Sequence, residues 1–561
     1  MLAPSSRREP HERRGRDRDL GPRLVALREL AWFRWLASFV ILFALGALWA
    51  FGNPLTATPD EPAHVIRAAA VSRGQLSGRP LTASEIAALP TTFGLGSNEG
   101  GVASAYRTVN IPEIYGRPNW GCLVHHPEHT AACIKFAGPK RDTRVLTHTT
   151  AYPPMYYAWV GIPARFGSPG PGAVYVMRLA AVALAAALLA SAVVSLGRVG
   201  DAPFAMLGLL VAVTPTALFL AASVNPSGLE IVAGLAVWVA GAVLVAEARS
   251  SVDGHLDRRL IARLGIATAV LVLSRQLGPF WAGLILLVLA GMAGRRGLRA
   301  LRASRALWAW GAVVGACFVA QMAWLVWSDG FDVHSYLGEP SHETGVELVR
   351  RGIGQSSMFY RQMIGDFGWN EVLAPAFTLL VWTAALGGLV ALAFVFGRRR
   401  DVVALAVVGI LAAVLPVAFL VYQSGYAGWL GRYVMPFAIG IPVLAGIALR
   451  GPALRHARRT AFALAAAGLA AGHVLAYGQN LRRNTVRADG TIWFWTGAKW
   501  SPPGTPLLLM IAFTIAAVAW VAWLITCQNA AAGTAHIMDS GSTECDDGAE
   551  KDLSFRGSRL P

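Results

Sequence analysis

The stretch AWFRWLASFVILFALGALWAFGNPLTATPDEPAHVIR, residues 31–67, joins a long apolar run to an adjacent pair of acids. The run from Ala31 to Phe51 is long enough to span a membrane as a helix and lacks the small-residue cleavage site of a secretory signal, so we expect a retained anchor. Asp60 and Glu61 follow soon after it. Because acids are costly to hold at an apolar boundary, the pair predicts a catalytic or ion-binding site.

Composition places the whole chain in a membrane. Of 561 residues, 55% are hydrophobic and 14% are charged, and the mean hydropathy of +0.48 is too apolar for a soluble protein of this length. A formal charge of +17 would suggest nucleic acid in a soluble chain, but the basic residues cluster in short segments between apolar runs. We interpret these basic residues as cytoplasmic topology determinants that also contact anionic membrane lipids. The prediction is an all-α polytopic membrane protein that binds no nucleic acid.

The apolar runs predict twelve transmembrane helices. They lie near residues 32–52, 173–197, 203–222, 228–247, 260–274, 277–293, 306–327, 373–396, 402–422, 433–449, 460–477 and 505–526. With a cytoplasmic N-terminus, the short basic segments all fall inside, as the positive-inside rule requires. The prediction is a multi-pass protein of a bacterial plasma membrane, in which a transmembrane domain at 32–527 lies between a cytoplasmic tail at 1–31 and a disordered cytoplasmic tail at 528–561.

Residues 53–172 form the largest polar segment, which is expected outside the membrane with structure of its own. Within it, the apolar stretch from Tyr152 to Phe166 would reverse the sidedness of the basic segment at 249–263 if it were a full span. We therefore predict an interfacial or re-entrant helix there. The other unusual polar segments then also lie on the outer side of the membrane. This arrangement favours a protein that acts on a substrate presented on that side.

Local spacing gives the acid pair two interpretations. Asp60 would cap a helix that runs to about Arg73, which places Asp60, His64 and Arg67 on one face. Asp60, Glu61 and His64 would then offer ligands for a divalent metal ion, or Asp60 would act as a general base while Arg67 holds a phosphate. In the alternative, Asp60 is only a helix cap and Glu61 complements the helix dipole.

The two cysteines of the outer segment, Cys122 and Cys133, would form a disulfide in an oxidising compartment. Between them, His125, His126, Glu128 and His129 are potential metal ligands, but their order matches no familiar zinc pattern. The favoured interpretation is a disulfide-pinned loop with solvated histidines.

Four further segments supply candidate binding residues. Asn225 either contacts a substrate or only precedes a helix start, at which Ser227 and Glu230 have capping-box spacing. Arg275 follows a short apolar stretch at the outer interface, where an arginine either snorkels or binds an anion.

The other two candidate segments begin or precede predicted spans. Arg432 and Tyr433 open one of these spans and are either an interfacial anchor or a ligand contact. Asp366 is an available carboxylate in a turn-rich segment before another span.

Several short motifs in a fixed order resemble a bacterial family of predicted membrane proteins that carries a domain of unknown function and is similar to GT-C glycosyltransferases. The motifs are PDEPAH (59–64), SRGQL (72–76), YPPMYY (152–157), RL (178–179), SVN (223–225), IGDFGW (364–369) and GRY (431–433). The likeness spans about residues 35–450. It implies a GT-C-like helical bundle in which Asp60 is a general base or metal ligand, Glu61 is its partner, and Arg275 and Arg432 hold a phosphate.

The resemblance also implies an activity. GT-C enzymes transfer a sugar from a polyprenyl-phosphate carrier to an acceptor outside the membrane, so the expected partners are a polyprenyl-phosphate-linked sugar and a cell-envelope glycan or protein. Two alternatives stay open. One is a transporter or flippase of lipid-linked sugars, for which twelve spans is a common number but which lacks mirrored halves here. The other is a membrane scaffold without chemistry.

Overall fold

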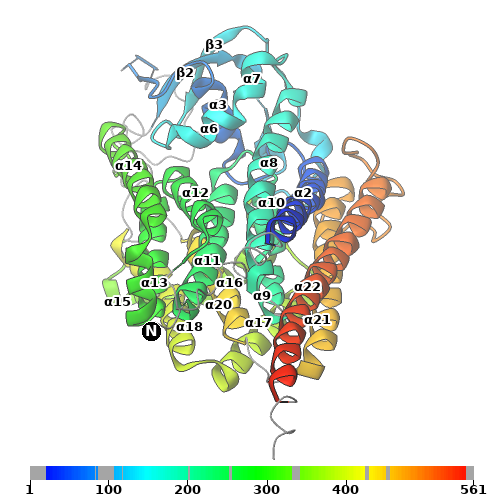
Figure 1. The fold of residues 1–561 in the computed structure, drawn as a ribbon. Helices are drawn as coiled ribbons and strands as arrows, with labels where there is room; N and C mark the ends of the chain where they lie inside the picture. The colour runs from blue at the N-terminus through cyan, green and yellow to red at the C-terminus, as the bar shows by residue number, and fades with distance from the viewer. Residues whose placement is uncertain are drawn as a thin grey trace, which may run out of the picture.

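The computed structural model describes residues 20–82, 84–85, 106–116, 118–199, 203–251, 255–331, 342–423, 429–449 and 455–550. Side chains are described from Ala31 to Gln528 within these ranges, apart from Trp120 and residues 455–457. Long helices make up most of this part of the chain and pack side by side into a bundle (Figure 1). The fold is therefore that of an all-α membrane protein, as the sequence predicts.

In the described ranges, ten helical segments are long and apolar enough to cross a membrane. Nine are single helices: α2 (Leu20–Gly52), α8 (Pro171–Leu196), α11 (Pro226–Ser250), α13 (Gly278–Ala303), α14 (Arg305–Trp327), α17 (Ala376–Phe396), α18 (Arg399–Tyr422), α21 (Arg455–Val486) and α22 (Pro506–Glu550). The tenth combines α19 (Gly431–Ala438) with α20 (Gly440–Ala448). An eleventh would join α9 (Pro203–Ala212) to α10 (Pro215–Ala221), which are bent by 58°.

The predicted twelfth span is a helix, α12 (Arg258–Ser274), but a short one. Its 17 residues reach about 26 Å, less than the ~30 Å thickness of the hydrocarbon core. Arg258, Arg259 and Arg263 also occupy its first turns. Ten or eleven of the twelve predicted spans therefore have the length of a full span in the described residues, and the twelfth is the helix formed by the short apolar stretch before Arg275.

Two helices are longer than the predicted domain boundaries. α2 begins at Leu20, within the predicted N-terminal tail, and α22 continues to Glu550, beyond the predicted boundary at Gln528. An alanine run at 530–532 is a strong helix former and favours this continuation. The rest of both predicted tails lies outside the described residues.

The bundle has two ends with different chemistry. At one end, which we call the basic end, Arg249 of α11 forms an ion pair of 2.6 Å with Asp401 of α18, and Arg198 bonds Glu247 at 2.7 Å. At the other end, which we call the loop end, β2, β3, α3, α6 and α7 lie together (top of Figure 1). The polar segment at 53–172, which was predicted to lie on one side of the membrane, thus lies at one end of the bundle.

The loop end has its own secondary structure. Its helices and strands are α3 (Glu61–Val71), β1 (Arg79–Pro80), β2 (Arg107–Pro112), η2 (Glu113–Tyr115), η3 (Trp120–Cys122), η4 (Ala131–Cys133), β3 (Asp142–Thr147), α6 (Pro154–Val160) and α7 (Ile162–Phe166). The strands make an antiparallel sheet in the order β1-β2-β3, in which Arg107 pairs with Thr147 and Pro112 with Asp142. Helices as short as α6 and α7 cannot cross a membrane, which confirms that the Tyr152–Phe166 stretch is not a span.

The remaining elements connect the long helices. They are η5 (Gly197–Val199), α15 (Gly345–Gly354), α16 (Ser356–Gly365), β4 (Asp366–Phe367) and β5 (Val372–Leu373), the last two forming an antiparallel pair.

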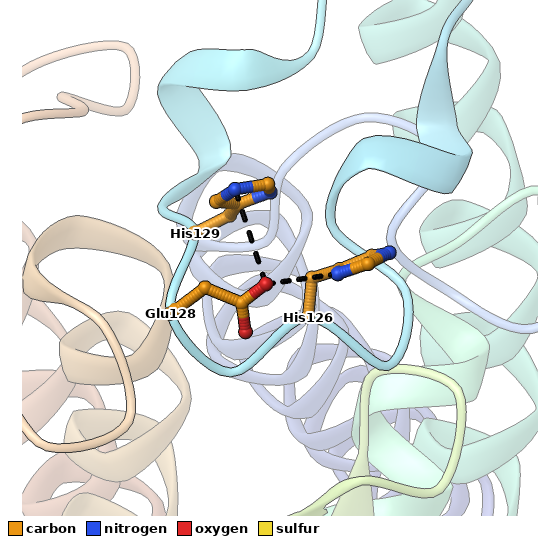
Figure 2. Close-up of side chains that lie close together, drawn as sticks. All are labelled: His126, Glu128 and His129. Atoms are coloured by element: carbon orange, nitrogen blue, oxygen red, sulfur yellow. Dashed lines mark hydrogen bonds and ion pairs between the residues drawn. The ribbon is translucent and has the colours of Figure 1, made fainter.

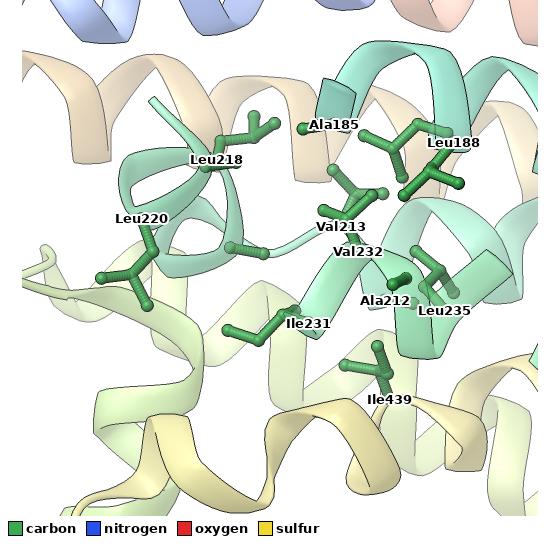
Figure 3. Close-up of a cluster of buried hydrophobic side chains, with 14 of the residues drawn as sticks. Ala185, Leu188, Ala212, Val213, Leu218, Leu220, Ile231, Val232, Leu235 and Ile439 are labelled. Atoms are coloured by element: carbon green, nitrogen blue, oxygen red, sulfur yellow. The ribbon is translucent and has the colours of Figure 1, made fainter. Parts of the chain in front are cut away.

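Close helix packing builds the core around α9, α11 and α20. Apolar side chains from α8, α10, α11 and the junction between α19 and α20 meet there, as Figure 3 shows for Leu188, Leu218, Leu235 and Ile439. A Cβ added at Gly208 would lie 2.2 Å from the carbonyl oxygen of Pro442, so α9 and α20 approach with backbone against backbone. Small residues at helix crossings are typical of membrane bundles. This rigid core carries the elements that converge at the loop end.

Candidate active site

Asp60 lies at the start of α3 in a conformation that the sequence did not predict. Its φ of 62° and ψ of −1° are left-handed, and its side chain makes no capping hydrogen bond. The carboxylate instead accepts a hydrogen bond of 2.9 Å from Arg432, and 36% of the side-chain surface remains exposed. The predicted role as a helix cap is therefore wrong. A left-handed aspartate costs on the order of 1 kcal/mol and persists only where neighbours enforce it, as at functional sites.

The Glu61 carboxylate enforces this turn from within the protein. It accepts hydrogen bonds from Arg178 Nε at 2.7 Å, from the Thr56 backbone amide at 2.9 Å and from the Val224 amide at 3.0 Å. Both Glu61 and Arg178 are fully buried. With both oxygens occupied, Glu61 holds the loop in place and does not face the exposed side of Asp60.

Asn225 also fixes the turn. Its amide donates to the carbonyl of Pro59 at 2.9 Å, and its side-chain oxygen accepts from the Ser227 amide and so caps α11. The capping box expected between Ser227 and Glu230 does not form, because the cap is Asn225 and Glu230 pairs elsewhere. Both polar atoms of Asn225 thus bond to the backbone, and the side chain is buried, so its contacts in the described residues serve the turn and the start of α11.

Two arginines gather around Tyr433. The guanidinium carbons of Arg432 and Arg275 lie 5.2 Å and 5.3 Å from the Tyr433 ring centroid, within cation–π range. Each arginine has one carboxylate partner: Asp60 for Arg432, and Glu230 for Arg275 at 3.2 Å. The structure therefore brings together Asp60 and the three predicted residues that come from distant parts of the chain.

Both guanidiniums keep buried donors without a partner. Nε and Nη1 of Arg432 and Nε of Arg275 bond to no acceptor among the described residues. A buried donor left unpaired costs about 1–3 kcal/mol, and more when it is charged. Arginine donors in this arrangement suit the oxygens of a phosphate or carboxylate.

The protonation states around Asp60 follow from burial and charge. Burial has the largest single effect on Asp60 and raises its pKa, but the positive charges around it, Arg432 first, together lower that pKa by more, to below its ordinary value. Burial lowers the pKa of His64 to about 3 and also lowers that of His148. At neutral pH, Asp60 is therefore ionised and both imidazoles are neutral.

The predicted metal-ligand set of Asp60, Glu61 and His64 does not form. Glu61 is bound to Arg178, and Nδ1 of His64 lies 2.8 Å from the Tyr157 hydroxyl. In the described part of the chain, the one group of three or more ligand-type side chains close enough to share an ion lies elsewhere, at His126, Glu128 and His129.

Arg67 does not face this site either. Its guanidinium donates to the carbonyls of Leu76 and Tyr152 and lies over the rings of Tyr157 and Trp324. Two of its donors thus tie loops to α3, while its Nε has no partner among the described residues. These contacts include neither Asp60 nor Arg432, and the phosphate contact that its spacing suggested stays a prediction.

Asp366 lies in the short strand β4, with only 6% of its surface exposed. Its backbone amide donates to the Thr216 hydroxyl at 3.2 Å, while its Oδ1 has no partner among the described residues. Burial, reinforced by the Glu371 carboxylate, raises the pKa of Asp366 to about 7. Arg432 is near enough to oppose this shift, so Asp366 borders the Arg432 site as a carboxyl that titrates near neutrality.

Sequence reasoning missed three contributors to the site. Glu230 was assigned to a helix cap, Arg178 was noticed only within a motif, and Tyr152 was treated as part of an interfacial helix. Tyr152 contacts both His64, at 5.2 Å between ring centroids, and the Arg275 guanidinium, at 5.8 Å. An acid near the start of an apolar helix, as at Glu230, is costly enough to have signalled a buried partner.

Comparisons with known proteins identify a family. A structural comparison finds the crystal structure of ArnT from Cupriavidus metallidurans bound to undecaprenyl phosphate, at 14% sequence identity and a TM-score of 0.38, covering 90% of this chain and 76% of that one. No curated protein matches. The model of a family described as "Predicted membrane protein (DUF2142)" matches residues 43–441, which is most of the chain. The chain therefore belongs to the DUF2142 family of predicted membrane proteins.

Proposed function

We propose that this protein is a membrane glycosyltransferase of GT-C type, which transfers a sugar from a polyprenyl-phosphate donor to a cell-envelope acceptor at the outer face of a bacterial plasma membrane. The observation that carries the proposal is the pairing of Asp60 with Arg432, whose other buried donors have no partner among the described residues. A carboxylate beside an anion-binding arginine is what sugar transfer from a phosphate carrier requires.

An apolar groove next to the site supports a lipid-linked substrate. The groove has a volume of about 320 Å³ and is lined by α9, α16, α17, α18, α19 and α20. Ile364 and Val434 belong to its wall, two residues from Asp366 and Arg432 respectively. A polyprenyl chain lying there would place its phosphate near the arginines at the loop end.

In the proposed reaction, the acceptor hydroxyl attacks the anomeric carbon as the bond between that carbon and the lipid phosphate oxygen breaks. Asp60 takes the hydroxyl proton, and Arg432 and Arg275 stabilise the departing lipid phosphate. Arg432 also links the binding of the lipid phosphate to the basicity of Asp60. When its donors turn toward the phosphate, Asp60 loses its positive partner and becomes a stronger base.

Glu61, Asn225 and Arg178 act in this proposal as positioning residues. They hold the left-handed turn that aims Asp60 away from the packed interior. His64 and Tyr433 complete the wall around Asp60 and the arginines, and no metal ion is needed to neutralise the phosphate where two guanidiniums converge.

The test uses a strain that lacks the chain and is complemented with the wild type, Asp60→Asn or Asp489→Asn. Asp489 is 73% exposed and pairs only with Arg487 among the described residues, so its variant is a matched acidic control. Loss of general base catalysis typically slows transfer by about 10²–10⁴-fold, so Asp60→Asn should remove a cell-envelope glycan that the other two chains restore, as measured by mass spectrometry. Unchanged glycans with normally inserted Asp60→Asn would overturn the proposal.

A lipid-linked sugar flippase is the second candidate, because the same arginines and groove would bind a lipid phosphate without chemistry. Proteoliposomes that contain the purified chain and a fluorescent polyprenyl-phosphate sugar separate the two functions. Movement of intact lipid to the opposite leaflet, with no release of lipid phosphate when an acceptor is added, would favour the flippase.

A further inference from the structure

A second cluster of ligand-type side chains lies at the loop end, in the loop closed by Cys122 and Cys133. Nδ1 of His126 is 2.9 Å from Oε1 of Glu128, and Nε2 of His129 is 3.9 Å from the same oxygen (Figure 2). One ligand atom from each side chain lies within 4.8 Å of the others. Ligand atoms of a tetrahedral zinc ion are separated by about 3.4 Å, so small side-chain rotations would bring all three to one ion.

The hydrogen bonds of His129 fix which nitrogen is free. Its Nδ1 lies 2.7 Å from the carbonyl oxygen of Cys122, and because a carbonyl only accepts, Nδ1 carries the proton. Nε2 then has a lone pair, and it is the nitrogen that faces Glu128. Metal-bound histidines usually donate their second nitrogen in this way, which holds the ring in the orientation that the metal requires.

The loop that carries the cluster is held on both sides. A disulfide joins Cys122 to Cys133, which confirms the pairing that the sequence left open. From α21, Arg483 donates to the backbone carbonyls of His129 and His126 at 2.7 Å and 2.9 Å. Three ligands within four residues are therefore already ordered, so binding an ion requires little rearrangement of the chain.

We propose that His126, Glu128 and His129 bind a zinc ion at the loop end, with the remaining coordination positions open to water or to a fourth group. Two imidazoles and one carboxylate suit zinc and its first-row neighbours, whereas magnesium and calcium prefer sites made only of oxygen ligands. The loop rests on Glu371, which accepts a hydrogen bond of 2.6 Å from the His125 amide. The ion would thus stiffen a loop that contacts the segment bearing Asp366. This proposal does not depend on the sugar-transfer activity.

The test measures zinc binding by the full chain, purified in detergent with a tag that contains no histidine and stripped with a chelator. We expect the wild type to bind one equivalent of Zn²⁺ in competition with a chromophoric chelator, and to give the visible absorption of tetrahedral Co²⁺ when cobalt replaces zinc. In His126→Ala/His129→Ala the affinity should fall by about 100-fold or more, because two direct ligands matter more than the outer-shell partners that contribute 10–100-fold.

His125→Ala is the matched control, because His125 lies in the same loop, is 73% exposed and is outside the cluster. It should bind zinc as the wild type does. Glu128→Gln keeps the shape of the side chain and should weaken binding without altering the fold, which gel filtration and the intact disulfide would verify. The proposal fails if the wild type binds no zinc, or if the double histidine variant binds it as tightly as the wild type.

Discussion

Two adjacent acids have opposite roles because of what surrounds each of them. Asp60 is partly exposed with one arginine partner, whereas Glu61 is buried beneath it with four donors from Arg178, Thr56 and Val224. The sequence predicted that the pair matters but not which acid faces outward. That choice depends on the left-handed backbone at Asp60, which is set by contacts from α8 and from the segment just before α11, more than a hundred residues away in the chain.

This contrast predicts that Glu61 contributes much more to the stability of the fold than Asp60 does. Glu61→Gln leaves the buried Arg178 charge without its anion, and breaking a buried ion pair typically costs about 3–5 kcal/mol. Asp60→Asn removes one hydrogen-bonded pair in which the acid is 36% exposed, so the expected cost is smaller, about 1–2 kcal/mol. Thermal unfolding of both variants in detergent should therefore give a clearly lower Tm for Glu61→Gln than for Asp60→Asn. Equal Tm values for the two variants would contradict the structural role of Glu61.

A second residue-scale prediction concerns Asp366. Its pKa is raised to about 7 in the folded protein from an ordinary value of 3.8, so the folded state binds the proton more tightly than the unfolded state. The stabilisation is complete below about pH 4 and is lost as pH rises through 7, with a size of a few kcal/mol at most. Relative to the wild type, the Tm of Asp366→Asn should therefore rise as the pH is raised from 5 to 8, because the wild type loses much of this stabilisation over that range. A constant difference across this range would refute the shift.

At the scale of elements, apolar runs predict helices well because each must bury its backbone in lipid by itself. Turn geometry is harder to predict from the sequence, because the disulfide loop, β4 and the start of α3 are shaped by contacts with distant elements. The motif order at 364–369 and 431–433 pointed to these segments as candidates for the site. It could not predict that α16 and α19 meet, which they do through a hydrogen bond of 2.7 Å from the Gly431 amide to Gln362.

The groove beside α19 gives a prediction at this scale. Gly409 of α18 lines the groove, and a Cβ added there would meet no atom within 4 Å, so Gly409→Phe should fill the groove without disturbing the helices. If a polyprenyl chain binds there, the variant should raise the KM for the lipid-linked donor while Tm stays unchanged. Gly315→Phe on α14 is the matched control, because Gly315 also has open space around it but lies outside the groove. Equal KM values in both variants would place the lipid elsewhere.

At the scale of the whole molecule, the alternation of spans was predictable from charge. The basic segments at Arg249 and Arg398 surround one cavity with Asp401 at the basic end, as the charge pattern predicted for segments on a common side. The short helix α12 keeps this pattern, because it leads from Asp257, which pairs with Arg198 at the basic end, to Arg275 at the loop end. The charge pattern predicts which segments lie at the same end of the bundle. The structure contains no membrane, so the side that each end faces is a separate prediction.

The final prediction is therefore the orientation of the bundle. Short arginine-rich connections are retained in the cytoplasm, so His255 at the basic end should lie inside and Asp489 at the loop end should lie outside. In a background whose Cys317, Cys527 and Cys545 are replaced by serine, each position is changed to cysteine and labelled with a membrane-impermeant maleimide. Asp489→Cys should react in intact spheroplasts, and His255→Cys only after the membrane is opened. The reverse pattern would put Asp60 and its arginines on the cytoplasmic side, where the proposed transfer to a cell-envelope acceptor could not take place.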